Sequence, residues 1–178
     1  MHLEKAFIAC IVMSLFTNVF AQNTESIKVN VLKEEVVINK MVITKKTTID
    51  EVIKAMGKPE RIEKFAGKDR KYIYDSKGYA FSTAPNNPKN LVESLTITYT
   101  YDNDKNVAKE KFRGTLMIDN FMVTEKNTIK EIADKTDFEK IECFGTMCAS
   151  DPKAKGIVTM IGMTESGDIL QIVFGFKP

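Results

Sequence analysis

Two kinds of hydrophobic pattern alternate along the chain. Segments rich in β-branched and aromatic residues predict strands; they span residues 36–44, 71–74, 79–83, 91–101, 156–163 and 168–176. Apolar residues at helical spacing predict a first helix from Ile49 to Met56, which Gly57 and Pro59 end. The same spacing returns at Ile129 and Ile132 and predicts a second helix.

The chain also matches itself at an offset of 80 residues. Residues 38–53 align without gaps to residues 118–133, and six of the sixteen positions are identical. The shared residues include Thr48, Ile49 and Glu51, which correspond to Thr128, Ile129 and Glu131. Threonine followed three residues later by glutamate has the spacing of a capping box at a helix start. At the second helix either Asn127 or Thr128 is the expected N-cap. The match predicts two copies of one supersecondary unit.

Each predicted unit is a strand, a helix and an antiparallel meander. We therefore expect an α+β fold, a tandem duplication with the helices on one face of the sheets. The predicted organisation is a signal peptide over 1–21, an N-terminal segment over 22–34, repeat unit 1 over 35–105 and repeat unit 2 over 106–178. Aspartate at either hydrophobic helix position, Ile49 or Ile129, should strongly destabilise the fold.

Strand alternation then indicates which side chains avoid the helices. In the strand near residue 97 the apolar side chains share one face and three threonines share the other. In the last strand Leu170, Ile172, Phe174 and Phe176 are expected to point inward and Ile169 outward. The outward surface is the predicted partner-binding face, and a plain solvated face is the alternative; its candidate residues are Thr96, Thr98, Thr100, Gln171 and Val173. The loops, at 85–90 and 143–148, are the fallback sites.

The N-terminus predicts export. Lys5 precedes an eleven-residue apolar run over 6–16, too short to span a bilayer but typical of a signal peptide, with cleavage expected after Ala21. The alternatives are a buried N-terminal helix and lipidation at Cys10, which follows a loose lipobox pattern. A periplasmic or secreted protein is the expectation.

Export changes the interpretation of the remaining cysteines. Cys143 and Cys148 are separated by four residues that include Gly145, and in an exported chain we expect them to form a structural disulfide. The alternative is a redox pair, which usually has two intervening residues.

Composition and charge narrow the function. The 26 basic and 24 acidic residues give a net charge of +2, so no strong field for nucleic acid is expected. The sole histidine is His2, which signal-peptide removal would take away, so imidazole catalysis and histidine-ligated metals are not expected.

Two motifs are candidate chemical sites. Residues 102–113 begin like a calcium loop but have Val107 and Arg113 where glycine and glutamate are needed. Glu51 and Glu131 could suggest paired carboxylates, but capping explains them. The sequence predicts no enzyme, no catalytic or metal site and no cofactor.

The segment 48–59 carries a family resemblance. Its threonine, apolar pair and Gly-x-Pro ending resemble the helix signature of outer-membrane assembly lipoproteins of the BamE type. The tandem arrangement resembles the beta-lactamase inhibitory proteins, in which two such units form a concave sheet that grips an enzyme. The resemblance implies a bacterial envelope protein that binds another protein.

We therefore expect an exported, non-catalytic protein-binding module, such as a periplasmic inhibitor or immunity protein against an envelope-directed toxin or hydrolase. The alternative is a structural envelope component that contacts outer-membrane proteins or peptidoglycan. The expected partner is another protein, with no nucleic acid and no stable membrane span. The oligomeric state is not predicted.

Overall fold

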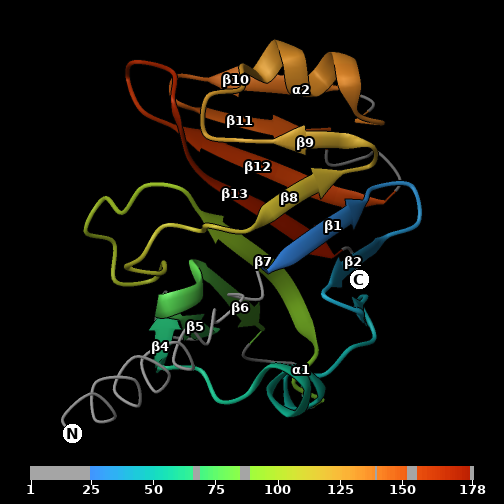
Figure 1. Ribbon diagram of the computed structural model, residues 1–178, viewed down its shortest axis with the longest axis vertical. Coiled ribbons are helices and arrows are strands. Elements are labelled where there is room, and N and C mark those ends of the chain that lie inside the picture. Colours follow the sequence, from blue (N-terminus) through green and yellow to red (C-terminus); the bar gives the residue numbers. More distant parts are fainter. Residues whose placement is uncertain (1–24, 66–68, 85–88, 139, 152–155, 177–178) are drawn as a thin grey trace, which may run out of the picture.

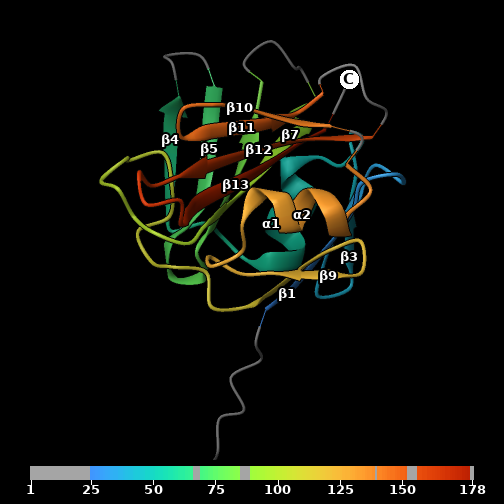
Figure 2. The same cartoon turned by 90° about the horizontal axis from the view of Figure 1, so that it is seen from above.

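The computed structural model describes residues 25–65, 69–84, 89–138, 140–151 and 156–176. The predicted signal peptide, Cys10 and positions 85–88 of the candidate loop lie outside the described residues. Two β-sheets stack as layers, with two short helices between them (Figures 1 and 2).

The larger layer is an eight-stranded sheet in the order β10-β11-β12-β13-β7-β6-β5-β4. Every neighbouring pair in it is antiparallel. Its strands are β4 (Arg61–Phe65), β5 (Asp69–Tyr74), β6 (Tyr79–Thr83), β7 (Val92–Thr98), β10 (Ile141–Phe144), β11 (Met147–Ser150), β12 (Ile157–Met163) and β13 (Ile169–Phe176). A 3-10 helix, η1 (Asp75–Lys77), joins β5 to β6.

The smaller layer is a five-stranded sheet in the order β3-β2-β1-β8-β9. Its strands are β1 (Ser26–Asn30), β2 (Glu35–Ile38), β3 (Met41–Ile43), β8 (Thr115–Ile118) and β9 (Phe121–Val123). The central strand β1 runs parallel to β8 and antiparallel to β2. Strands nearly 90 residues apart in the sequence therefore meet at the centre of this layer.

The helices begin where the sequence predicts. Helix α1 (Ile49–Met56) and helix α2 (Ile129–Lys135) each start with a complete capping box, formed by Thr48 with Glu51 and by Thr128 with Glu131. They lie at opposite ends of the molecule (Figure 1). Both fill space between the layers, as the view from above shows (Figure 2).

The core lies between the two sheets. One cluster of buried side chains joins Ile27 and Leu116 of the smaller sheet to Phe81, Leu95 and Phe174 of the larger one. The inward faces of both sheets are consequently removed from water, and burial of this apolar area is the main stabilising contribution to the fold.

The predicted fold class is wrong. The described residues contain thirteen strands but only two α-helices, so the protein is mostly β, and no helix-strand repeat organises its layers. Each sheet takes strands from both halves of the chain, which local sequence patterns cannot reveal because strand pairing depends on long-range contacts. The division of the chain at residue 105 stays a prediction.

Three local details also differ from the sequence interpretation. The single strand expected over 36–44 is a hairpin, because Asn39 and Lys40 have positive φ angles and form its turn. The N-terminal segment contributes the central strand β1. In β13 a bulge shifts the register beside Met163, so Ile169 is fully buried and Leu170 is half-buried, the reverse of the expected alternation.

Candidate protein-binding face

The eight-stranded sheet has one face turned away from the five-stranded sheet, which we call the outer face. Strand alternation places Thr96 and Thr98 there, because Leu95 and Ile97 of the same strand join the core. Cross-strand register extends the outer face to Val173 opposite Thr96 and to Gln171 opposite Thr98. The direction predicted for these four side chains agrees with the structure.

Their accessibility differs from the prediction. Thr96 and Thr98 are each only 1% exposed, and Lys71 Nζ donates a hydrogen bond to Thr96 Oγ1 at 3.3 Å. Thr98 Oγ1 is buried without a hydrogen-bond partner among the described atoms. Thr100 is exposed but lies beyond the end of β7. Thr96 and Thr98 are therefore covered, and the threonines do not form the open surface that the sequence suggested.

A groove on the same face contains the other two candidates. It has a volume of about 310 Å³, and Gln171 and Val173 line it together with Met147, Met160 and Gly162. Gly162 lies opposite both Met147 and Gln171 in the sheet, and a Cβ added there would approach Gln171 Cγ to 3.3 Å. The missing side chain leaves a depression between the two neighbouring strands.

Exposed apolar side chains continue from this groove to the sheet edge. Phe144 is 81% exposed, Met147 46% and Met160 41%. Phe144 is directly opposite Met147 in the β10–β11 hairpin, and Met160 is directly opposite Val173. We call Phe144, Met147, Met160 and Val173 the outer patch. The sequence analysis missed its first three members. Phe144 and Met147 lie on β10 and β11, neither of which was predicted. Met160 lies on the predicted strand β12, where side-chain alternation could have placed it on the outer face.

The loop after β7 also lines the groove, through Asp104, Asn106 and Val107. Arg61 fixes this loop by donating to the carbonyl oxygens of Lys105 at 2.7 Å and Val107 at 2.9 Å. Its Nε and Nη2 atoms also donate to the carboxylate of Asp75, at 2.6 and 3.0 Å. The side chains of Arg61 and Asp75 are only 18% and 17% exposed. Sequence reasoning did not single out Arg61, because Asp75 and the two loop carbonyl groups are 14 or more residues away from it.

Two hydrogen-bond donors keep the carboxyl group of Asp75 charged. The hydrogen bond from Arg61 lowers the pKa of Asp75, and a further bond from the backbone N–H of Lys109 at 2.9 Å acts in the same direction. A charged Asp75 therefore holds both Arg61 and the start of the segment after the loop.

The groove also has polar walls. Ser82 and Ser94, on the paired strands β6 and β7, share a hydrogen bond between their hydroxyl oxygens. Lys71, Glu93 and Asp104 add charges of both signs around the groove. An apolar centre bordered by polar and charged groups is the usual composition of a protein-binding surface.

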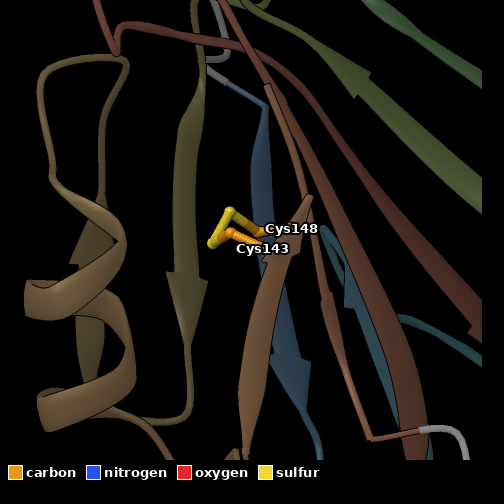
Figure 3. Close-up of a disulfide and its surroundings, with 2 residues drawn as sticks. All are labelled: Cys143 and Cys148. Carbon is orange, nitrogen blue, oxygen red and sulfur yellow. A yellow bond between two sulfur atoms is a disulfide. The ribbon is translucent and has the colours of Figure 1, made fainter. Parts of the chain in front are cut away.

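The predicted disulfide between Cys143 and Cys148 is confirmed. The two residues are directly opposite each other in the β10–β11 hairpin, with Cα atoms 4.0 Å apart. Their sulfur atoms point to the inner side of the hairpin (Figure 3), and Cys148 is fully buried. A disulfide there ties together the two strands that carry Phe144 and Met147, and such bonds persist in oxidising compartments, as in secreted proteins.

The other carboxylates noted in the sequence have structural roles. Backbone hydrogen bonds from Thr48 and Thr128 lower the pKa of Glu51 and Glu131, as capping requires. In the segment that resembles a calcium loop, Asn106 donates to Asp104 Oδ1 through its backbone N–H and its side chain.

Within the described residues no cluster of three or more histidine, cysteine or acidic side chains could hold a metal ion. No helix in the described part of the chain is long and apolar enough to cross a membrane.

Comparison with known families gives the chain its classification. Residues 28–133, from β1 into α2, match the family described as "Domain of unknown function (DUF7738)". The chain belongs to the DUF7738 family. Membership in DUF7738 assigns no activity, and no curated protein matches the chain.

Two solved structures are distantly similar to this DUF7738 protein. One is an extracellular protein containing a SCP domain from Bacillus anthracis str. Ames, with 12% identity and a TM-score of 0.41, covering 72% of this chain. The other is a cysteine-rich secretory protein from Staphylococcus aureus subsp. aureus Mu50, with 13% identity and a TM-score of 0.37, covering 74% of this chain. The chain spans 42% of the length of each. The resemblance to BamE-type lipoproteins and beta-lactamase inhibitory proteins stays a prediction.

Proposed function

We propose that this DUF7738 protein is an exported, non-catalytic protein-binding module that holds its partner on the outer face. The observation that carries the proposal is the outer patch, in which three large apolar side chains are 41–81% exposed on adjacent strands beside a groove. Large apolar side chains that gather on a surface, rather than occurring singly, mark interaction sites.

The architecture supports a rigid surface. The outer patch lies on β10–β13, where each strand pairs with the next in one sheet. The Cys143–Cys148 disulfide also crosslinks β10 to β11. Arg61 holds the loop that lines the groove by donating to the carbonyl oxygens of Lys105 and Val107. A preorganised surface loses little conformational entropy on association, which favours binding.

Methionine and aromatic side chains suit this role. Both are enriched at protein interfaces, and the flexible thioethers of Met147 and Met160 can adjust to an incoming side chain. The partner class that we propose is a toxin or hydrolase directed at the cell envelope, which the protein inhibits or neutralises. Support for that class comes from the family resemblance of segment 48–59 and from the predicted export.

Affinity capture from envelope extracts tests the proposal. The exported chain should capture a specific partner, and Met147→Lys or Met160→Lys should abolish capture, because a buried ammonium without a partner is costly. Met122→Lys is the matched control, since Met122 is 56% exposed on β9 of the other sheet. Loss of capture in all three variants, or in none, would contradict a site on the outer patch.

The binding test must avoid the covered threonines. Thr98→Lys would introduce an ammonium at a position that is 1% exposed, so lost capture could result from unfolding. Gln171→Glu is the better companion, because Gln171 is half-buried and lines the groove. Thermal melting of each variant separates lost binding from lost folding.

The exported state has its own test. Intact mass with and without thiol alkylation should show a chain that begins at or near Gln22 and contains no free thiol. Two alkylated cysteines in exported material would contradict the disulfide, and a diacylglyceryl group on Cys10 would replace cleavage after Ala21 with lipidation.

A further inference from the structure

Strand β10 forms an edge of the eight-stranded sheet (Figure 1). Asp151 donates its backbone N–H to the carbonyl oxygen of Lys140 at 2.9 Å, in register with the β10–β11 ladder. Hydrogen-bonded and non-hydrogen-bonded pairs alternate along an antiparallel ladder. The N–H and C=O groups of Ile141 and Cys143 therefore point away from β11, toward the open edge.

This edge has unused hydrogen-bonding capacity. Among the residues that the structure describes, none donates to or accepts from the outward backbone groups of Ile141 and Cys143. Both residues are in a regular strand whose only described sheet neighbour is β11. An open edge of this kind is a template for pairing with another strand.

The charges on β10 restrict which strand can pair there. Lys140 and Glu142 are 63% and 56% exposed on the side chain and form an ion pair with each other. Edge charges usually prevent pairing with foreign strands. An antiparallel second copy, however, presents the same two charges in reverse order and so can match them.

We propose that two copies of this chain associate through antiparallel pairing of β10, with Ile141 opposite Ile141 of the second copy. In this register Lys140 lies opposite Glu142 of the second copy, and the two-fold symmetry repeats the contact. The outward groups of Ile141 then exchange hydrogen bonds with those of the second copy. The interface joins two eight-stranded sheets along one edge.

The neighbouring registers are less favourable. Pairing Ile141 with Cys143 of the second copy places Glu142 directly opposite Glu142, and like charges in such positions are destabilising. Pairing Cys143 with Cys143 places Glu142 opposite Phe144 and leaves the charges unmatched. Charge complementarity thus selects one register.

Analytical ultracentrifugation of the exported chain over a range of concentrations tests the proposal. The wild-type chain should show a monomer–dimer equilibrium, and Lys140→Glu should raise its dissociation constant about tenfold or more, because two attractive contacts become repulsive. The double variant with Lys140→Glu and Glu142→Lys should restore the wild-type value, since it reverses both charges. Lys45→Glu is the matched control, because Lys45 also belongs to an exposed ion pair, with Glu34 at 3.6 Å.

The double variant identifies the register. If Glu142 were opposite Glu142, reversing both charges would leave a like-charged contact and would not restore dimerisation. A wild-type chain that remains monomeric, a dimer that Lys140→Glu does not weaken, or a double variant that fails to recover would each overturn the proposal. Thermal melting of every variant confirms that the monomers fold. Met147→Lys and Met160→Lys should leave the dimer intact, so this proposal and the proposed partner-binding function can fail separately.

Discussion

Arg61 shows how a single residue shapes a surface far from it in the sequence. Its guanidinium joins strand β4 to Asp75 after β5 and to two carbonyl oxygens of the loop after β7. Lysine could not replace it, because an ammonium lacks the planar set of five donors that these partners require. The loop wall of the groove therefore depends on one side chain.

Asp75→Asn should lower the free energy of unfolding by about 2 kcal/mol at neutral pH, because it removes a charge-assisted pair with Arg61. The pKa of Asp75 is lowered in the folded state, so its contribution is present above the unfolded pKa of about 3.9 and is lost as the pH falls through the folded pKa. Urea unfolding at several pH values measures this difference. A gap between wild type and variant that persists in strong acid would contradict the assignment.

Gly78→Ala tests a close backbone approach. Gly78 has a φ of +76°, and a Cβ added there would lie 2.2 Å from the backbone nitrogen of Phe112. We expect a loss of more than about 3 kcal/mol, because the backbone of residue 112 must move. Gly57→Ala is the control: its φ is also positive, at +88°, but its Cβ would meet no atom within 4 Å. Its expected loss, about 1–3 kcal/mol, therefore comes from backbone strain alone. Thermal melting of both variants should rank them in this order, and equal losses would contradict the close contact.

At the scale of elements, the two helices share their starts but differ in burial. Both begin with a Thr–Glu capping box, yet Ile49 of α1 is 1% exposed whereas Ile129 of α2 is half-buried. On α2 the fully buried residue is Ile132. Equivalent positions of the two helices therefore differ in how much they contribute to the free energy of unfolding.

Ile49→Asp should destabilise the protein by about 4 kcal/mol, since it places a carboxylate in the core. Ile129→Asp should cost about half as much, because water still reaches that position. The sequence predicts that both changes are strongly destabilising, and the partial exposure of Ile129 lowers the expected loss for α2. Denaturant unfolding of the two variants provides the comparison, with Ile132→Asp expected to match Ile49→Asp. Equal losses at Ile49 and Ile129 would contradict the difference in burial.

At the scale of the whole molecule, buried tyrosines connect the core to the elements around it. Tyr74 donates its hydroxyl to the carbonyl oxygen of Gly57 at 2.9 Å, and Tyr99 donates to that of Val123 at 3.0 Å. Burial raises the pKa of Tyr74 to about 12 and also raises those of Tyr79 and Tyr99. The neutral hydroxyl is thus part of the folded state.

These pKa values predict alkaline instability. A raised folded pKa favours the neutral form, so the contribution of each tyrosine is complete below the unfolded pKa of about 10 and is lost as the pH rises toward the folded pKa. The free energy of unfolding should fall above about pH 10, and Tyr99→Phe should reduce that slope by up to about 1.4 kcal/mol per pH unit. Denaturant unfolding at several pH values measures the slope, and tyrosinate absorbance measures the ionisation of the tyrosines. An unchanged slope in the variant would show that Tyr99 ionises freely in the folded protein.

The sequence by itself determined the features that depend on neighbouring residues. The helix starts at Thr48 and Thr128, several strands and the Cys143–Cys148 disulfide were predictable, because capping, side-chain alternation and short-loop closure involve groups only a few residues apart. The outward direction of Gln171 and Val173 followed from the same alternation.

Only the tertiary structure decided how these pieces combine. The parallel pairing of β1 with β8, the covering of Thr96 and Thr98, and the position of Arg61 all depend on residues far apart in the chain. The physical reason is that strand pairing and side-chain exposure are determined by the burial of the whole apolar surface rather than by local pattern. The outer patch of Phe144, Met147, Met160 and Val173 exists only because the sheet places β10, β11, β12 and β13 side by side.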